Sequence, residues 1–222
     1  GDVVTPLSVT ALLMTPPVSS VPIMLDGLLY YGMGAMVGEQ TEGRGDPAEI
    51  EAIGLPLARI TGDAGEWWYA ASQHTLTGPE SRVYFHRRAA LELAREFGDF
   101  ASMNVASGDD KSLRVPLYFR PGQLRLDFTC IGDRVAVASL LSRVPFVGKY
   151  SAWGWGQVGR WEVNESDGPG EIAYRTDPQF RHLPCRPGWY PKGVRKWTAP
   201  LRPPYWDRSA AVPVWQAVET RR

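Results

Sequence analysis

Hydrophobic residues follow two spacings in the first forty positions, and each spacing predicts one element. Residues 3–14 are rich in Val, Leu and Thr and run into two prolines, which predicts a buried strand. From residue 22 to residue 37, hydrophobic side chains recur every three or four positions, and Asp26 falls in the first turn, where the helix dipole favours a carboxylate. This segment predicts a core helix on a sheet, and Gly32, Gly34 and Gly38 would allow close backbone approach.

Shorter hydrophobic runs predict a series of strands further along the chain. In order, the pattern gives strands at 55–61, 66–72 and 82–88, a helix at 89–98, a polar loop at 104–111, strands at 113–119 and 124–131 around a turn at 120–122, a helix at 133–143 with Asp133 as N-cap, and a last strand at 158–163. A strand, a helix, paired strands, a second helix and a last strand make the order of a ferredoxin-like domain. The expected fold class is therefore α+β, with an RRM-like core.

The periodic pattern fades after residue 164. Residues 1–164 are predicted to form the ferredoxin-like domain, and residues 165–222 an irregular extension rich in proline and aromatic residues. Trp and Tyr side chains are too apolar to leave in water, so this extension is expected to be ordered and to wrap over the sheet.

Charge is divided unevenly between the two halves of a chain whose net charge is zero. Residues 1–110 contain 6 Lys and Arg against 15 Asp and Glu, and residues 111–222 contain 18 against 9. The halves thus carry −9 and +9. This asymmetry favours a basic surface for an acidic partner and an acidic surface that faces water or basic proteins, although a chance segregation of solvated charges remains an alternative.

Cys130 and Cys185 lie far apart, without the spacing of a zinc site or a disulfide framework. No metal or organic cofactor is implied. The most apolar stretch, residues 25–37, is shorter than the roughly 20 residues of a membrane span. We expect a reduced, cytoplasmic protein without a membrane partner.

The most informative segment is the glycine loop, residues 147–158, which precedes the last strand. Its glycines permit left-handed turns and expose backbone amides, its lysine supplies a cation, and its three aromatic rings offer stacking faces for bases. The RNA-binding residues predicted here are Gly148, Lys149, Tyr150, Ser151, Trp153, Gly154, Trp155 and Gly156. The alternative is an ordinary turn with its aromatic side chains packed inward.

Two further basic groups extend this candidate RNA-binding surface. The first comprises His86, Arg87, Arg88, Lys111 and Arg114, and the second comprises Lys192, Arg195 and Lys196 beside Trp197. The second group could grip RNA or extend its aliphatic stems over a packed tail.

The glycine loop resembles that of RAMP superfamily proteins, in which a hydrophobic residue, a glycine, a basic residue and a glycine–aromatic–glycine pair precede the last strand of a ferredoxin-like domain. Three shorter strings, residues 22–29, 69–73 and 203–206, are similar to the five-type backbone subunit of type IV CRISPR effectors. The resemblance implies a non-catalytic subunit that caps the crRNA 5′ handle. It also implies contacts with the backbone and large subunits of the effector, next to target DNA and its protospacer.

Two other functions stay open at this point. A RAMP endoribonuclease that processes crRNA could use His74, His86 or His182 as a base, with Tyr30 and Tyr31 as substitutes, but no histidine lies in the first helix or the glycine loop. A carbohydrate-binding module could use Trp67, Trp68, Trp153 and Trp155 as platforms. The basic second half of the chain argues against neutral sugars.

Overall fold

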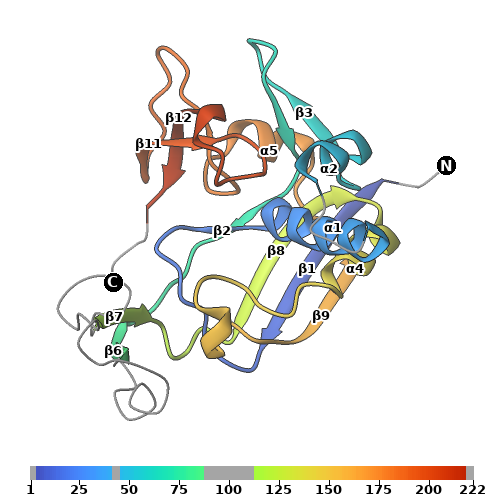
Figure 1. Cartoon of the computed structure of the whole chain (residues 1–222). Coiled ribbons are helices and arrows are strands. Elements are labelled where there is room, and N and C mark those ends of the chain that lie inside the picture. Colours follow the sequence, from blue (N-terminus) through green and yellow to red (C-terminus); the bar gives the residue numbers. More distant parts are fainter. Residues whose placement is uncertain (1–3, 42–45, 88–112, 219–222) are drawn as a thin grey trace, which may run out of the picture.

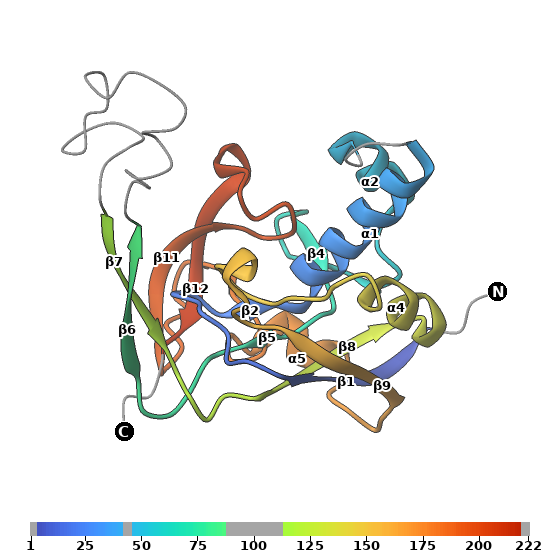
Figure 2. The same cartoon turned by 60° about the horizontal axis from the view of Figure 1, so that its bottom comes forward.

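The computed structural model describes residues 4–41, 46–87 and 113–218, which form a mixed α/β protein with antiparallel sheets (Figure 1). The main sheet has the order β8-β1-β9, built from β1 (Thr5–Leu13), β8 (Arg125–Gly132) and β9 (Val158–Glu165). Helices α1 (Leu25–Thr41) and α4 (Arg134–Leu141) lie over one face of this sheet (Figure 2). The predicted first strand, both helices and the last strand are confirmed.

Alternation along β1 explains why the helices cover this face. Leu7, Val9 and Ala11 are fully buried, because every second residue of a strand points to the same side. The two helices approach closely where Gly32 of α1 meets the backbone carbonyl of Leu140 in α4, and a Cβ atom at residue 32 would overlap that oxygen. The predicted close approach at a helix glycine is therefore confirmed.

The opposite face of the main sheet carries charged side chains that are exposed to solvent. Thr10 donates a hydrogen bond of 2.7 Å to Asp127, which also accepts from Arg125, and Arg160 pairs with Glu162 on β9. The C-terminal segment covers the β8 end of this face, as predicted: Tyr174 donates a hydrogen bond of 2.9 Å to Thr129, and Ile131 packs against a hydrophobic cluster that includes Leu183 and Val214. The charged side chains farther along the face keep their contact with water, because burying them under apolar rings would remove their hydration.

The remaining elements are short. They are α2 (Pro47–Ile53), α5 (Glu171–Thr176), strands β2 (Ile23–Met24), β3 (Arg59–Thr61), β4 (Trp67–Tyr69), β5 (Gln73–His74), β6 (Ser81–Arg87), β7 (Leu113–Phe119), β10 (Leu183–Pro184), β11 (Val194–Pro200) and β12 (Ala211–Ala217), and the 3₁₀ turns η2 (Ser151–Trp153) and η3 (Arg208–Ala210). None of the described helices is both long and apolar enough to cross a membrane.

The segment after residue 164 is more regular than its composition suggested. Strands β10, β12 and β11 form a second antiparallel sheet, and β11 and β12 pair over seven residues. This sheet packs on the β3–β4 hairpin through a second hydrophobic cluster that includes Ile60, Trp68, Leu183 and Val214. The prediction of an irregular extension is wrong, because cross-strand packing between alternate residues is not visible in a proline-rich sequence. The boundary at residue 164 stays a prediction.

A fully buried ion pair ties the C-terminal segment to the start of α1. Arg181 and Asp26 have no exposed side-chain surface and approach to 3.3 Å. Tyr205 donates to Asp26 at 2.8 Å, and Arg181 also donates to the Leu201 carbonyl at 2.6 Å. The two contacts of Asp26 join residues that are more than 150 positions apart.

The strands at 113–119 and 125–132 belong to different sheets. Strand β7 pairs with β6, whereas β8 pairs with β1, so the expected pairing of these two strands is wrong. The β6–β7 hairpin projects from one end of the molecule (Figure 2). The turn at residues 120–122 redirects the chain from this hairpin into the main sheet. The predicted helix at 89–98 and loop at 104–111 lie outside the described residues.

Candidate nucleic-acid interface

The glycine loop is a closed turn between α4 and β9. Its ends are joined by a hydrogen bond of 2.8 Å from the Val147 amide to the Gly156 carbonyl. Gly156 adopts φ +69°, and a Cβ atom there would overlap the Val147 carbonyl oxygen. Gly148 has φ +82° and lies against the Val18 carbonyl, 2.6 Å from where a Cβ atom would stand. The predicted left-handed turns are thus confirmed, and these two glycines are required by close backbone contacts.

Most amides of the glycine loop are used inside the protein. The Lys149 amide donates to Val18, the Gly154 amide to Ser151, and the Gly156 amide to Pro16. An amide that already donates to a carbonyl is not available to a phosphate without breaking that bond. These three amides are therefore committed within the protein, and binding of a phosphate by the other amides of the loop stays a prediction.

The aromatic residues of the loop pack against the β6–β7 hairpin. Trp153 stacks on Phe85 at 3.7 Å between ring centroids and on Tyr150 at 4.8 Å. Trp155 lies 4.7 Å from Phe119. Trp153 keeps 42% of its surface exposed. The ring stacks anchor the hairpin to the loop, as the inward-packing alternative expected, and leave the outer part of Trp153 accessible.

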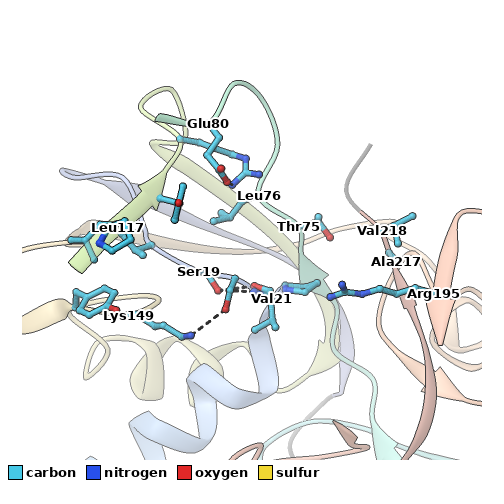
Figure 3. Close-up of a pocket in the computed structure, with 17 residues that line it drawn as sticks. Ser19, Val21, Thr75, Leu76, Glu80, Leu117, Lys149, Arg195, Ala217 and Val218 are labelled. Carbon is cyan, nitrogen blue, oxygen red and sulfur yellow. Dashed lines mark hydrogen bonds and ion pairs between the residues drawn. The ribbon is translucent and has the colours of Figure 1, made fainter. Parts of the chain in front are cut away.

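A cavity of about 710 Å³ lies beside the loop, between β7, the bend at residues 18–22 and the end of the β11–β12 pair. Lys149 and Arg195 extend into it from opposite sides (Figure 3). The Lys149 ammonium donates to the Ser20 hydroxyl at 3.1 Å. Lys149 of the glycine loop and Arg195 of the second basic group, far apart in the sequence, therefore meet at one cavity.

Cations outnumber carboxylates among the residues that line this cavity. Lys149, Arg195 and Arg120 are basic, and Glu80, 3.6 Å from Arg120, is the acidic one. Tyr150 and Tyr118 add aromatic surface. A cavity with excess positive charge and aromatic walls is suited to a phosphate group with its attached base. We call it the cationic cavity.

The second basic group is divided by the alternation of β11. Arg195 packs on Trp197 at 4.8 Å, donates to Gln216 and faces the cationic cavity. Lys196 follows on the opposite side of the strand, near Cys185, and Lys192 is exposed before the strand begins. Of these three lysine and arginine residues, Arg195 is the one placed to reach the cavity.

The outer face of the β6–β7 hairpin carries a further basic and aromatic group. The Arg114 guanidinium lies 3.7 Å over the Tyr84 ring, and that of Arg82 lies 4.9 Å from the same ring. Arg114 was predicted from sequence. Arg82 and Tyr84 were missed, although their spacing of two in a strand placed them on one face.

The other predicted residues of this group are only partly described. His86 pairs in register with Arg114, and Arg87 with Leu113, but their side chains lie outside the described part of the structure. Arg88 and Lys111 lie outside it altogether.

Two of the three histidines are held by hydrogen bonds within the fold. His182 is buried and bonded to the Pro200 carbonyl at 2.7 Å, and burial lowers its pKa to about 3. His74 contacts the Asp127 backbone and Gln123, and burial lowers its pKa as well. Neither histidine lines the cationic cavity.

The tryptophans proposed for a sugar platform do not share a surface. Trp68 is fully buried, and Trp67 is covered by the guanidinium groups of Arg59 and Arg202 at 4.5 and 4.2 Å. Trp153 and Trp155 lie in the glycine loop instead. These positions weigh against the carbohydrate-binding alternative.

Fold and cavity together define a mixed α/β protein whose cation-lined cavity is built from the glycine loop and the C-terminal sheet. Residues 99–217, just over half of the chain, match the family of the CRISPR type IV associated protein Csf3. The chain belongs to this family and is a component of a type IV CRISPR effector. The match spans β7, β8, α4, the glycine loop and the second sheet. No curated protein matches the sequence.

Proposed function

We propose that this chain is a non-catalytic, crRNA-binding subunit of the RAMP superfamily that caps the crRNA 5′ handle as the five-type backbone subunit of the effector. It would contact the neighbouring backbone and large subunits and lie near target DNA next to the protospacer. The observation that carries this proposal is the meeting of Lys149 and Arg195 at the cationic cavity, from segments 46 positions apart.

The arrangement of the main sheet supports a ferredoxin-like core. Three antiparallel strands in the order β8-β1-β9, with α1 after β1 and α4 between β8 and β9, correspond to three strands and both helices of that fold. The outer edge of β8, where a fourth strand would pair, is contacted by residues 70–72, and the Ser72 amide donates to Thr129 at 2.8 Å. A short segment thus replaces the fourth strand.

The cationic cavity favours binding of the crRNA 5′ handle at the cavity over recognition of RNA bases on the open face of the main sheet. An RRM-type surface stacks bases on aromatic side chains of the open sheet. Here that face carries the ion pairs Arg125–Asp127 and Arg160–Glu162, whose charges balance, so it offers a phosphate no excess of positive charge. The cationic cavity does offer such an excess.

A non-catalytic role is proposed because the described histidines are committed elsewhere. A general base needs a pKa near the working pH and reach to the ribose hydroxyl. His182, with its pKa lowered to about 3 in the core, meets neither condition. Specific cleavage of labelled repeat RNA by the purified chain would favour the endoribonuclease alternative instead.

The test is crRNA occupancy of the effector reconstituted with Lys149→Ala/Arg195→Ala. Removing two phosphate contacts should lower the salt dependence of handle binding by about two units of slope and reduce occupancy at physiological salt. Arg134→Ala, an exposed arginine on α4 that does not line the cavity, is the matched control and should behave like the parent. Equal occupancy and equal salt slope in the double variant and the parent would contradict the proposal.

A further inference from the structure

A second cavity lies on a different side of the fold, between α1, α2 and the loop at residues 203–206. Its volume is about 1100 Å³. Small residues of α1, Gly27, Gly34 and Ala35, line it together with Ile50 of α2. We call it the α1–α2 groove.

Aromatic rings line the groove, and two of them are exposed. Tyr31 and Trp206 have 61% and 72% of their surface in solvent, whereas Tyr205 is held in place by its hydrogen bond to Asp26. Large exposed rings next to a concave apolar surface are typical of protein interfaces, which are enriched in Trp and Tyr.

Carboxylates lie in the segment that forms one side of the groove. Asp46 lines the groove, and Glu49 and Glu51 follow on α2. Glu51 has a weak partner in Arg202 at 3.8 Å, while Glu49 has no ion pair with any residue that the structure describes. Tyr30, in the groove wall, feels this negative charge. Its pKa is raised by burial and, in addition, by the nearby carboxylates of Glu51 and Asp46.

We propose that the α1–α2 groove binds an arginine- or lysine-bearing segment of another protein subunit of the effector. Aromatic faces attract cations, and carboxylates at the rim supply the matching charge. The inference rests on the chain being a component of a type IV CRISPR effector, but not on the RNA-binding role of the cationic cavity.

The same features disfavour other occupants. RNA would bring phosphates next to Asp46, Glu49 and Glu51, where like charges repel. A small molecule is favoured less than a peptide, since the volume exceeds the usual range of about 300–1,000 Å³ for small-molecule sites and the most exposed ring, that of Trp206, would stay largely uncovered.

The experiment places the photocrosslinker p-benzoylphenylalanine at position 206, and separately at position 31, in the reconstituted effector. Mass spectrometry then identifies what each position joins. The expected product is a peptide of another protein subunit that contains Arg or Lys. Crosslinks to RNA, to DNA, to a second copy of this chain or to nothing in an assembled complex would overturn the proposal.

Two comparisons separate this result from the function of the cationic cavity. The crosslinker at Tyr150 should join RNA, and failure there alone would count against the handle cap while leaving the groove proposal standing. Asp46→Asn/Glu49→Gln should lower the crosslink yield at position 206 roughly threefold by removing rim charges. Glu171→Gln, an exposed carboxylate on α5, should leave the yield unchanged. Equal yields in both variants would overturn the proposed role of charge.

Discussion

Asp26 and Arg181 each lose all contact with water, and their pairing joins the C-terminal segment to the first helix. Desolvation raises the pKa of Asp26, and the Arg181 guanidinium opposes that shift. Either charge alone in the same place would be strongly unfavourable, because a buried ion without a partner keeps its desolvation cost. The sequence identified Asp26 as a residue of the first helical turn, but its partner could not be predicted, since 155 positions separate the two.

Arg181→Met should reduce the free energy of unfolding by about 3–5 kcal/mol, because it leaves Asp26 buried beside apolar atoms. Asp26→Asn/Arg181→Met removes both charges and should recover a part of that loss. Urea denaturation of the single and double variants measures both effects. A single variant within about 1 kcal/mol of the parent would contradict the structural role of the pair.

His182 should make stability fall with acidity. Its folded-state pKa is about 3, lowered by burial and then by Arg181, whereas the unfolded histidine titrates near its ordinary 6.5. A depressed histidine pKa gives stability that is present above pH 6.5 and is lost as the pH falls toward 3. Between pH 6.5 and 5 this loss should approach about 2 kcal/mol.

His182→Gln retains a side-chain donor for the Pro200 carbonyl but does not titrate. Its melting temperature should therefore fall less steeply than that of the parent as the pH is lowered from 6.5 to 5. The difference between the two profiles isolates the histidine from the carboxylates, which titrate in both proteins. Parallel profiles would show that His182 is not the buried neutral group described here.

Around the glycine loop, the sequence predicts the individual helices and strands but not how all of these strands pair. Alternation and N-cap chemistry correctly predicted β1, β8, α4 and β9, because these signals are local. The pairing of β7 with β6 was missed, since it depends on tertiary contacts such as the ring stack of Phe85 on Trp153. Residue content likewise could not show which loop amides already have protein partners.

Gly156→Ala should destabilise the protein by about 2–4 kcal/mol, because it combines a left-handed φ with a clash against the Val147 carbonyl. Gly154 shares the left-handed φ but faces open space, so Gly154→Ala should cost only about 1 kcal/mol. Thermal unfolding of the two matched variants measures the difference. Similar losses in both would mean that the loop is not closed as observed.

In the whole molecule, basic and acidic side chains gather at different cavities. The cationic cavity takes Lys149 and Arg195 from the basic half of the chain, and the α1–α2 groove takes its carboxylates from the acidic half. Regional charge counting predicted two such surfaces, and the residues that line the two cavities agree with that separation in part: three cations and Glu80 at one, Asp46 at the other. Their shapes could not be predicted, because each depends on tertiary contacts of the C-terminal segment.

The measurement that tests the central claim most directly is protein–RNA crosslinking of the assembled, unmodified effector by ultraviolet light, with the linked residues and nucleotides identified by mass spectrometry. We expect crosslinks from residues at the cationic cavity, foremost Lys149 and Tyr150, to nucleotides of the crRNA 5′ handle. Crosslinks confined to the spacer, or to residues of the α1–α2 groove with none at the cationic cavity, would contradict the proposed cap.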